Sequence, residues 1–186
     1  MELWIEALVK DKKGKVLKRI KRKAHSFVGN FIRCLAVQFA SGEEAITDVG
    51  GNAVNPYANQ YNLKAGAGSG DDDFGIQAGT GTNAVSINDN ALQTKIAHGT
   101  GSGQLQYGAV TFGATACDAA KCECTITRDF ANGSGGDITV NELGLVLQTW
   151  DGNYKNILVA RDVVSGGIAV ANGQTLTVNY KIRATA

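Results

Sequence analysis

The sequence is poor in proline and histidine, and it has no long hydrophobic run. A single proline, Pro56, stands against 24 glycines in 186 residues, so the glycine excess does not mark a disordered proline- and glycine-rich tract. Nothing approaches the roughly 18 consecutive apolar residues of a membrane-spanning helix, and we expect no membrane partner. The first residues lack the basic and apolar regions of a secretory signal peptide, so we expect synthesis in a cytoplasm.

Chemically active residues are few and show no catalytic spacing. The only histidines are His25 and His98, and neither has a nearby serine or cysteine with an orienting acid, as a hydrolytic triad requires. Glu142 and Asp162 are candidate paired carboxylates, but together with Arg161 they fit turn hydrogen bonds or an inter-strand salt bridge better. We therefore predict that the protein is not an enzyme and has no cofactor.

Short runs of Val, Ile, Leu and Thr alternate with clusters of Gly, Asn, Asp and Ser, most clearly in the segment Thr125–Arg183. This pattern is typical of strands joined by tight turns. Roughly six to nine such runs predict a mainly β protein with an antiparallel β-sandwich, of which a jelly roll is one arrangement. We expect this glycine-rich sandwich to occupy residues 41–186. The run Gln104–Thr115 is expected to be one of its strands, and Cys122–Phe130 another, with Cys124, Ile126 and Arg128 on one face.

Residues 1–40 form a separate element in this interpretation, used for packing or assembly. Apolar runs on either side of Lys10–Lys15 predict an N-terminal β-hairpin, and residues 26–40 predict one amphipathic helix. A helix this apolar must pack against its own sheet or against another subunit. The packing and assembly candidates are the apolar residues of the helix and of the best period-two strand, namely Phe27, Phe31, Leu35, Phe39, Leu176, Val178, Tyr180 and Ile182.

Charge is distributed unevenly along the chain. Residues 1–40 contain ten Lys and Arg against three acids, and the other 146 residues contain eight against fourteen. The favoured interpretation is that the basic end of one subunit docks on the acidic body of another. The alternative is nucleic-acid contact through residues 10–23, because lysine and arginine neutralise phosphates, although aromatic residues for base stacking are missing there. The candidate anion contacts are Lys18, Arg19, Lys21, Arg22 and Lys23.

Three cysteines lie close together, in the pattern C-x4-C-x-C. Cys117, Cys122 and Cys124 could supply a zinc site with Cys34 or His98, but structural zinc sites normally show paired C-x2-4-C spacings. A disulfide from Cys117 to Cys122 or to Cys124 is a second possibility, since a released particle meets oxidising surroundings. Inert or partly buried thiols are the favoured interpretation, and no metal is predicted.

The acidic run Asp71-Asp72-Asp73 lies in a long glycine-rich stretch. Calcium prefers several oxygen ligands, but the run lacks the alternating ligand spacing of known calcium loops. A solvated acidic loop is therefore favoured over a Ca²⁺ site in residues 65–75.

Four segments appear in a fixed order along the chain: GIQAGTGTNAVSINDNALQTKIAHG, LQYGAVTF, TRDFANGSGGDITVNELGL and ILVARDVVSGGIAVANGQTLTVNYKI. In residue type and order they resemble a group of uncharacterised structural proteins of tailed bacteriophages. The hairpin and the SFVGNF start of the helix are similar too, so the resemblance spans most of the chain. The chain departs from the family pattern after Leu145, where an aromatic residue often follows, and in its cysteine cluster.

The resemblance implies a non-enzymatic component of the virion, in the head as a capsid or decoration protein or in the tail. Its partners would be other copies of itself, in a symmetric oligomer, and other virion proteins. An alternative is a carbohydrate- or receptor-binding module of the tail, which would need an exposed aromatic platform. Trp150, Tyr154, Tyr57 and Tyr61 are the candidates for that platform.

Overall fold

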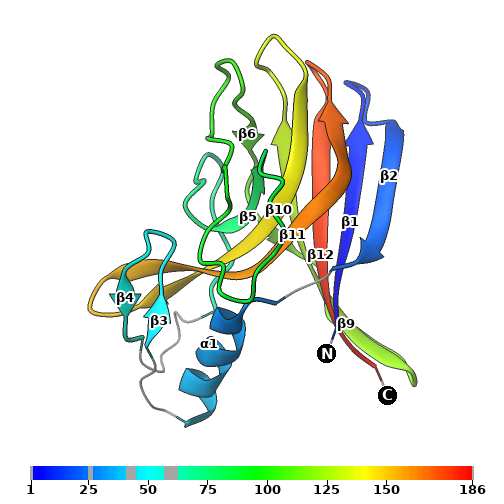
Figure 1. Cartoon of the computed structure of the whole chain (residues 1–186). Helices are drawn as coiled ribbons and strands as arrows, with labels where there is room; N and C mark the ends of the chain where they lie inside the picture. The colour runs from blue at the N-terminus through cyan, green and yellow to red at the C-terminus, as the bar shows by residue number, and fades with distance from the viewer. Residues whose placement is uncertain (1, 25–26, 41–44, 57–62, 186) are drawn as a thin grey trace.

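The computed structural model of the chain describes residues 2–24, 27–40, 45–56 and 63–185, without the side chains of residues 32, 36–40 and 185. Two antiparallel sheets form a sandwich (Figure 1). The small sheet has three strands in the order β11 (Tyr154–Val170), β10 (Ile138–Trp150) and β5 (Gly75–Gly79). The mainly β, antiparallel sandwich predicted from the sequence is confirmed.

The large sheet has seven strands, with the order β2-β1-β12-β9-β6 and with β7 and β8 also paired to β9. Their bounds are β1 (Glu2–Lys10), β2 (Val16–Lys23), β6 (Gln106–Tyr107), β7 (Thr111–Phe112), β8 (Ala116–Cys117), β9 (Lys121–Ala131) and β12 (Thr175–Thr185). A two-stranded pair, β3 (Ile46–Thr47) and β4 (Ala53–Val54), and one helix, α1 (Gly29–Ala40), complete the described elements.

The core lies between the two sheets and follows the period-two alternation of the strands. Leu176, Val178 and Tyr180 of β12 are buried, as predicted, and Ile182 is half-buried near the end of the strand. In β1, Ile5 pairs with Tyr180 and is equally buried. Alternate side chains of a strand point to opposite faces of the sheet, so one face of β1 and β12 closes the core. The other face includes Glu6 and Thr177, which are buried as well.

The predicted N-terminal hairpin is confirmed, and it is hydrogen-bonded into the large sheet. All nine residues of β1 pair with β12, from Glu2 opposite Arg183 to Lys10 opposite Thr175. The hairpin turn is closed by Asp11, whose carboxylate accepts hydrogen bonds from the backbone N–H groups of Lys13 and Lys15 at 2.8 and 2.9 Å. The division of the chain at residue 40 stays a prediction.

Helix α1 lies against the small sheet, at the end where the chain termini also lie (Figure 1). The backbone N–H of Val28, just before the helix, donates to Val159 O at 3.0 Å, which fixes the start of the helix on β11. The rings of Phe27 and Phe31 stack with centroids 4.0 Å apart. Phe31 is buried and Leu35 half-buried. Phe39 belongs to the part of the helix whose side chains are outside the description.

The expected strand Gln104–Thr115 is divided into β6 and β7 because the chain changes hydrogen-bonding partner between them. Gly108 N–H donates to Asp129 O on β9, whereas Val110 N–H donates to Ala67 O in the loop of residues 65–74 that precedes β5. By contrast, β9 confirms the expected alternation, since Cys124, Ile126 and Arg128 lie at alternate positions and Ile126 and Arg128 are buried.

Candidate assembly and binding surfaces

Glu142 and Arg161 form a buried ion pair between β10 and β11. The Arg161 Nε donates to Glu142 Oε2 at 2.8 Å, and the Glu142 side chain is completely buried. The same carboxylate accepts three backbone N–H bonds, from Gly81 at 3.1 Å, Gln93 at 3.0 Å and Thr94 at 2.7 Å. The inter-strand salt bridge expected for Glu142 is therefore confirmed, and its role is to hold residues 81–94 on the small sheet.

Asp162 does not join Glu142 in a carboxylate pair. Asp162 pairs with Leu143, the neighbour of Glu142, so the two carboxylates lie on opposite faces of the small sheet. Asp162 is buried in the sandwich, 4.0 Å from the Nη2 of Arg22. A two-carboxylate catalytic centre is thus not formed by these two residues.

Arg128 is a second buried charge, and it holds another loop. Its guanidinium lies over the Tyr107 ring, 4.7 Å from the centroid, and its side chain is fully buried. It donates to five backbone carbonyls, those of Gly108 at 2.8 Å, Phe74 at 2.9 Å, Ile76 at 3.0 Å, Gly68 at 3.2 Å and Asp71. An arginine has five N–H donors in a rigid fork, so this one residue bonds four carbonyls of residues 68–76 and the carbonyl of Gly108.

Three of the five candidate anion contacts on β2 are engaged within the chain. Arg19 Nε donates to Glu6 at 2.9 Å, and Lys23 Nζ lies 2.6 Å from Glu2. Arg22 donates to the backbone oxygen of Val163 at 2.7 Å. Burial of Glu6 raises its pKa, but the bond from Arg19 and the charge of Lys181 outweigh that effect and lower the pKa overall.

The other two candidates, Lys18 and Lys21, are exposed, and neither forms an ion pair with the described residues. A larger unpaired basic cluster is the lysine turn, which we define as residues 10–15 between β1 and β2. It contains Lys10, Lys12, Lys13 and Lys15 against the single acid Asp11. Unpaired positive charge is therefore denser at this turn than along β2, where Lys18 and Lys21 supply it.

The cysteine cluster lies at the hairpin formed by β8 and β9. Cys117 and Cys122 are joined by a disulfide, while Cys124 and Cys34 are free. Burial raises the pKa of the Cys34 thiol to about 12. Among the described residues, no group of three or more His, Cys, Asp or Glu side chains could hold a metal ion. His98, the other residue considered for a zinc site, forms a hydrogen bond within the chain: its Nδ1 accepts the Tyr107 N–H at 3.0 Å.

The three acids of residues 71–73, where the sequence favours a solvated acidic loop over a calcium site, have different surroundings. Asp71 accepts the backbone N–H of Asp73 at 3.0 Å. Asp72 accepts the N–H of His98 at 2.6 Å and pairs with Lys95 at 3.1 Å. Burial raises the pKa of Asp72, but those two hydrogen bonds lower it overall. The Asp73 carboxylate is exposed.

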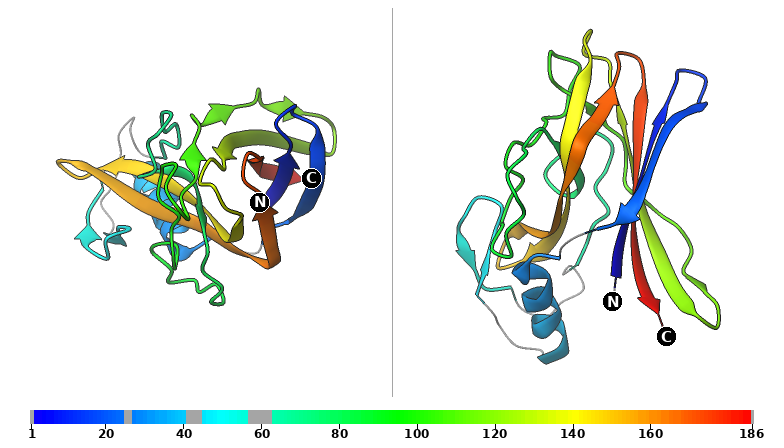
Figure 2. Two further views of the ribbon diagram at one scale, coloured as in Figure 1. Left: turned by 90° about the horizontal axis from the view of Figure 1, so that it is seen from above. Right: turned by 45° about the vertical axis from the view of Figure 1, so that its right-hand side comes forward.

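An apolar groove of about 330 Å³ opens at the end of the sandwich where α1 lies. At this end of the molecule the ends of β9 and β12 diverge from α1 (Figure 2). Phe112, on one wall, is 60% exposed, which is high for a phenylalanine. The lining is Phe31, Leu35, Leu63, Ala65, Phe112, Cys124, Ile126, Leu145, Leu147, Val159 and Ile182.

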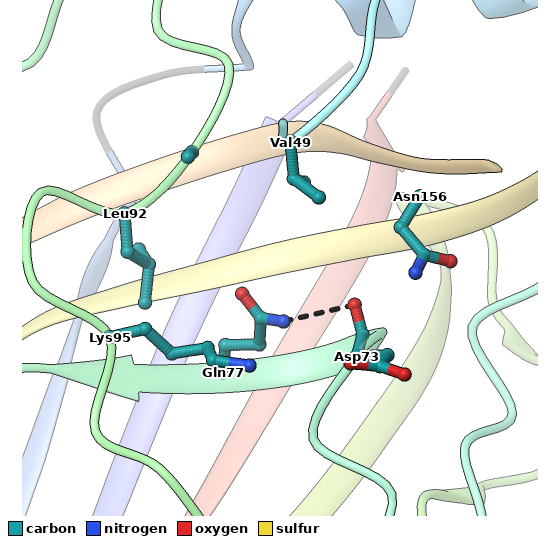
Figure 3. Close-up of a pocket in the computed structure, with 7 residues that line it drawn as sticks. Val49, Asp73, Gln77, Leu92, Lys95 and Asn156 are labelled. Carbon is teal, nitrogen blue, oxygen red and sulfur yellow. Dashed lines mark hydrogen bonds between the residues drawn. The ribbon is translucent and has the colours of Figure 1, made fainter. Parts of the chain in front are cut away.

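A smaller cavity of about 210 Å³ lies on the outer face of the small sheet, under the turn between β3 and β4 (Figure 3). Gln77 extends along it, with its Nε2 bonded to the Asp73 backbone oxygen at 3.1 Å and its Oε1 turned towards Leu92. Apolar side chains form its other wall. The lining is Val49, Asp73, Gln77, Ala91, Leu92, Lys95 and Asn156.

An aromatic pair lies at the turn joining β10 and β11. The rings of Trp150 and Tyr154 meet edge to face with centroids 5.0 Å apart, and Tyr154 is 52% exposed. Tyr57 and Tyr61, the other candidates for a sugar-binding platform, lie outside the described residues. Two of the four expected residues are thus brought together.

Comparison with protein-family models, with curated proteins and with solved structures finds no match to this chain. None of the described helical segments has both the length and the hydropathy needed to cross a membrane. The functional assignment therefore depends on the residues, the surfaces and the sequence resemblance.

Proposed function

We propose that this chain is a non-enzymatic structural protein of a tailed-phage virion, a subunit that assembles with copies of itself and with other virion proteins in the head or tail. The observation that carries the proposal is the apolar groove. The groove contains Phe112 in an exposed position at one end of the sandwich, and exposed apolar surface of this kind marks protein–protein contact. The resemblance to phage structural proteins supports the same conclusion.

The buried charges support a structural role as well. Glu142, Arg161 and Arg128 bond to other groups of the chain, and their bonds fix the loops that cover the small sheet. Rigid loops on a sandwich give a subunit a defined shape before it meets its neighbours. Identical subunits can then bury one surface against another under closed symmetry, with no chemistry beyond complementary surfaces.

The test of the groove is the association state of the purified protein. Light scattering coupled to size-exclusion chromatography should show oligomers of the wild type, and Phe112→Asp should shift them towards the monomer because a charge cannot be buried unpaired in an apolar contact. Ile87→Asp is the matched control, since Ile87 is 62% exposed but does not line the groove. A wild type that stays monomeric at every concentration, or an equal effect of both variants, would contradict the proposal.

A carbohydrate- or receptor-binding tail module is the second candidate, favoured by the Trp150–Tyr154 pair at an exposed turn. Aromatic rings at such positions offer a flat face to a sugar ring. A glycan-binding screen with the wild type and with Tyr154→Ala decides this candidate. Binding that disappears in the variant supports it, and a screen with no bound glycan removes it.

A further inference from the structure

One wall of the apolar groove is formed by a segment that has almost no burial of its own. Residues 111–120, which we call the groove arm, are exposed at every position and include β7 and β8. Within the described part of the chain, these two strands pair with β9 alone. Two strands without a shared core are marginally stable at best in water, so burial does little to hold the arm in place.

The position of Phe112 in the groove depends on the arm. Phe112 lies opposite Ile126 of β9, and opposite residues of a strand pair have neighbouring side chains on one face. Both side chains line the groove, together with Cys124. Phe112 is 60% exposed, so contacts with the rest of the chain cover less than half of it. The groove therefore keeps its shape at this wall while β7 stays paired with β9.

The strand to which the arm is bonded, β9, is fixed from its other side. It pairs with β12 along its full length, Lys121–Ala131. The arm has two paired residues in β7, two in β8 and a backbone bond between them, from Gly113 N–H to Thr125 O at 2.9 Å. The arm can therefore separate from β9 while β9 keeps its place in the large sheet.

The Cys117–Cys122 disulfide joins the far end of the arm to β9. The two cysteines lie directly opposite each other in the ladder, where Cβ atoms are about 4.5–5.5 Å apart, against about 7 Å on the diagonal. Cys124, two positions along β9, is on that diagonal, beyond the Cβ spacing of about 3.5–4.5 Å that a disulfide requires. Cys124 therefore stays a free thiol on the groove wall, and the arm is linked through Cys122.

This disulfide is open to thiol–disulfide exchange, because Cys117 is exposed and Cys122 is half-buried. A small thiolate attacks Cys117 Sγ, the S–S bond breaks, and Cys122 leaves as a thiolate. A second small thiolate attacks the mixed disulfide, frees Cys117 and forms a low-molecular-weight disulfide, so that two electrons and two protons pass to the protein. The reverse reaction, with oxidised glutathione as the oxidant, closes the bond and releases two molecules of glutathione.

The size of the effect follows from the loop that the bond closes. In the chain-entropy description, a link across a sequence separation of five favours the closed form by a factor of about 40. A closing constant of about one for the reduced arm, as for a marginal hairpin, therefore rises to about 40 in the oxidised arm. About half of the reduced molecules have the arm in place, against nearly all of the oxidised ones.

We propose that the Cys117–Cys122 disulfide is a redox switch for the apolar groove. In the oxidised chain the arm is held on β9, and Phe112 is fixed for contact with a second copy. In the reduced chain the arm separates from β9 in about half of the molecules, and the contact loses that part of its binding-competent population. The inference rests on the proposed function, because the contact is the self-association assigned to the groove.

The first experiment measures the arm itself, by solvent-exchange NMR of the full chain in oxidised glutathione and in a phosphine reductant. The N–H of Gly113, which bonds Thr125 O when the arm is in place, should exchange about 20-fold faster after reduction, in the ratio of the open fractions. The matched control is the N–H of Gly108, which bonds Asp129 O on the same strand outside the arm and should not change. Equal exchange of Gly113 in the two states would overturn the inference.

Two variants assign the response to this disulfide. Cys117→Ser with Cys122→Ser should show fast exchange at Gly113 with and without the reductant, at the rate of the reduced wild type. Cys124→Ser keeps the disulfide, so its Gly113 N–H should respond to the reductant as the wild type does. A response that persists in the double variant, or one that disappears in Cys124→Ser, would refute the assignment.

The second experiment measures self-association by sedimentation velocity of the oxidised and the reduced protein. Reduction should weaken association at least about twofold, because about half of the arms open, and Cys117→Ser with Cys122→Ser should match the reduced wild type in both conditions. The residual association of Phe112→Asp should not respond to the reductant, because that variant has already lost the groove contact. Equal association of oxidised and reduced wild type would defeat the inference and leave the proposed function standing. A wild type that is monomeric in both states would contradict the proposed function itself, and the inference with it.

Discussion

Replacement of Glu142 by glutamine tests whether the buried ion pair holds residues 81–94 on the sandwich. The carboxylate accepts four hydrogen bonds, from Arg161 Nε at 2.8 Å and from the N–H groups of Gly81, Gln93 and Thr94 at 3.1, 3.0 and 2.7 Å. Glutamine retains one of the two carboxylate oxygens and replaces the other with an NH₂ group. That NH₂ group then faces two N–H donors. Two donors therefore lose their acceptor, and Arg161 loses its buried counter-charge.

The cost follows from the burial of these groups. Breaking a buried ion pair by removing one partner costs about 3–5 kcal/mol, and we expect Glu142→Gln to lower the free energy of unfolding by that amount. At about 2–4 °C per kcal/mol for a chain of this size, the midpoint of thermal unfolding should fall by about 10 °C. Urea unfolding followed by tryptophan fluorescence measures the difference, provided that the slope with denaturant is unchanged.

Asp89→Asn is the matched control for this prediction. Asp89 accepts from the other end of the same guanidinium at 2.9 Å, but its side chain is 21% exposed, and an asparagine oxygen can keep the bond. We expect a loss of no more than about 1 kcal/mol, as for other partly exposed pairs. A Glu142→Gln variant within about 1 kcal/mol of the wild type, or one no less stable than Asp89→Asn, would refute the reasoning.

Three further predictions concern other parts of the chain. Arg128→Lys should lower the free energy of unfolding by about 2–4 kcal/mol, because one ammonium cannot serve five carbonyls, and limited proteolysis should then cut residues 65–75 faster; an uncut loop would contradict the assignment. Glu6 has a lower pKa in the folded than in the unfolded chain, so its contribution to the free energy of unfolding is complete above about pH 5 and is lost as the pH falls through its folded-state pKa. The Glu6→Gln variant should therefore show a smaller loss of stability in urea between about pH 5 and 3 than the wild type. An equal loss of stability in the two proteins would count against the Arg19 contact. The Cys34 thiol, with its pKa raised to about 12, should react with a thiol reagent at pH 8 more slowly than the half-buried Cys124 until urea is added, and equal rates would show that Cys34 is accessible.

The long strands could be predicted because their apolar residues alternate. Leu176, Val178 and Tyr180 show the period of two that one buried face imposes, and the structure buries all three. In the central part of β10 the alternation disappears, since Leu143, Leu145 and their neighbours are buried on both faces of the sheet. Apolar content identified this strand even where periodicity did not.

The sequence could not predict the loop conformations or the residues that hold the loops in place, because these contacts join residues far apart along the chain. Glu142 binds residues 81–94, about 50 to 60 positions earlier, and nothing in the local pattern names those partners. One signal was available for Arg128, which shares an alternating face with Ile126, a core residue. A charged side chain on a core face must form bonds within the fold. The position of Arg128 could therefore have predicted that it holds another segment in place, but not which five carbonyls it bonds.

The candidate surfaces were foreseen in part. Uneven charge predicted a basic N-terminal region, but pairing on the sheet neutralises Arg19 and Lys23 and leaves the charge at the lysine turn. The apolar groove combines Phe31 and Leu35, predicted for assembly, with Phe112, which the sequence did not single out. The lining residues come from elements far apart along the chain, so no local pattern predicts that they meet.

The most direct test of the central claim is the protein content of purified phage particles produced from a genome that encodes this chain. Quantitative mass spectrometry of the particles should find the chain at a fixed ratio to the other structural proteins, and electron microscopy should show it in symmetric copies on the head or tail. A chain that stays monomeric in the lysate and is absent from the particles would contradict the account.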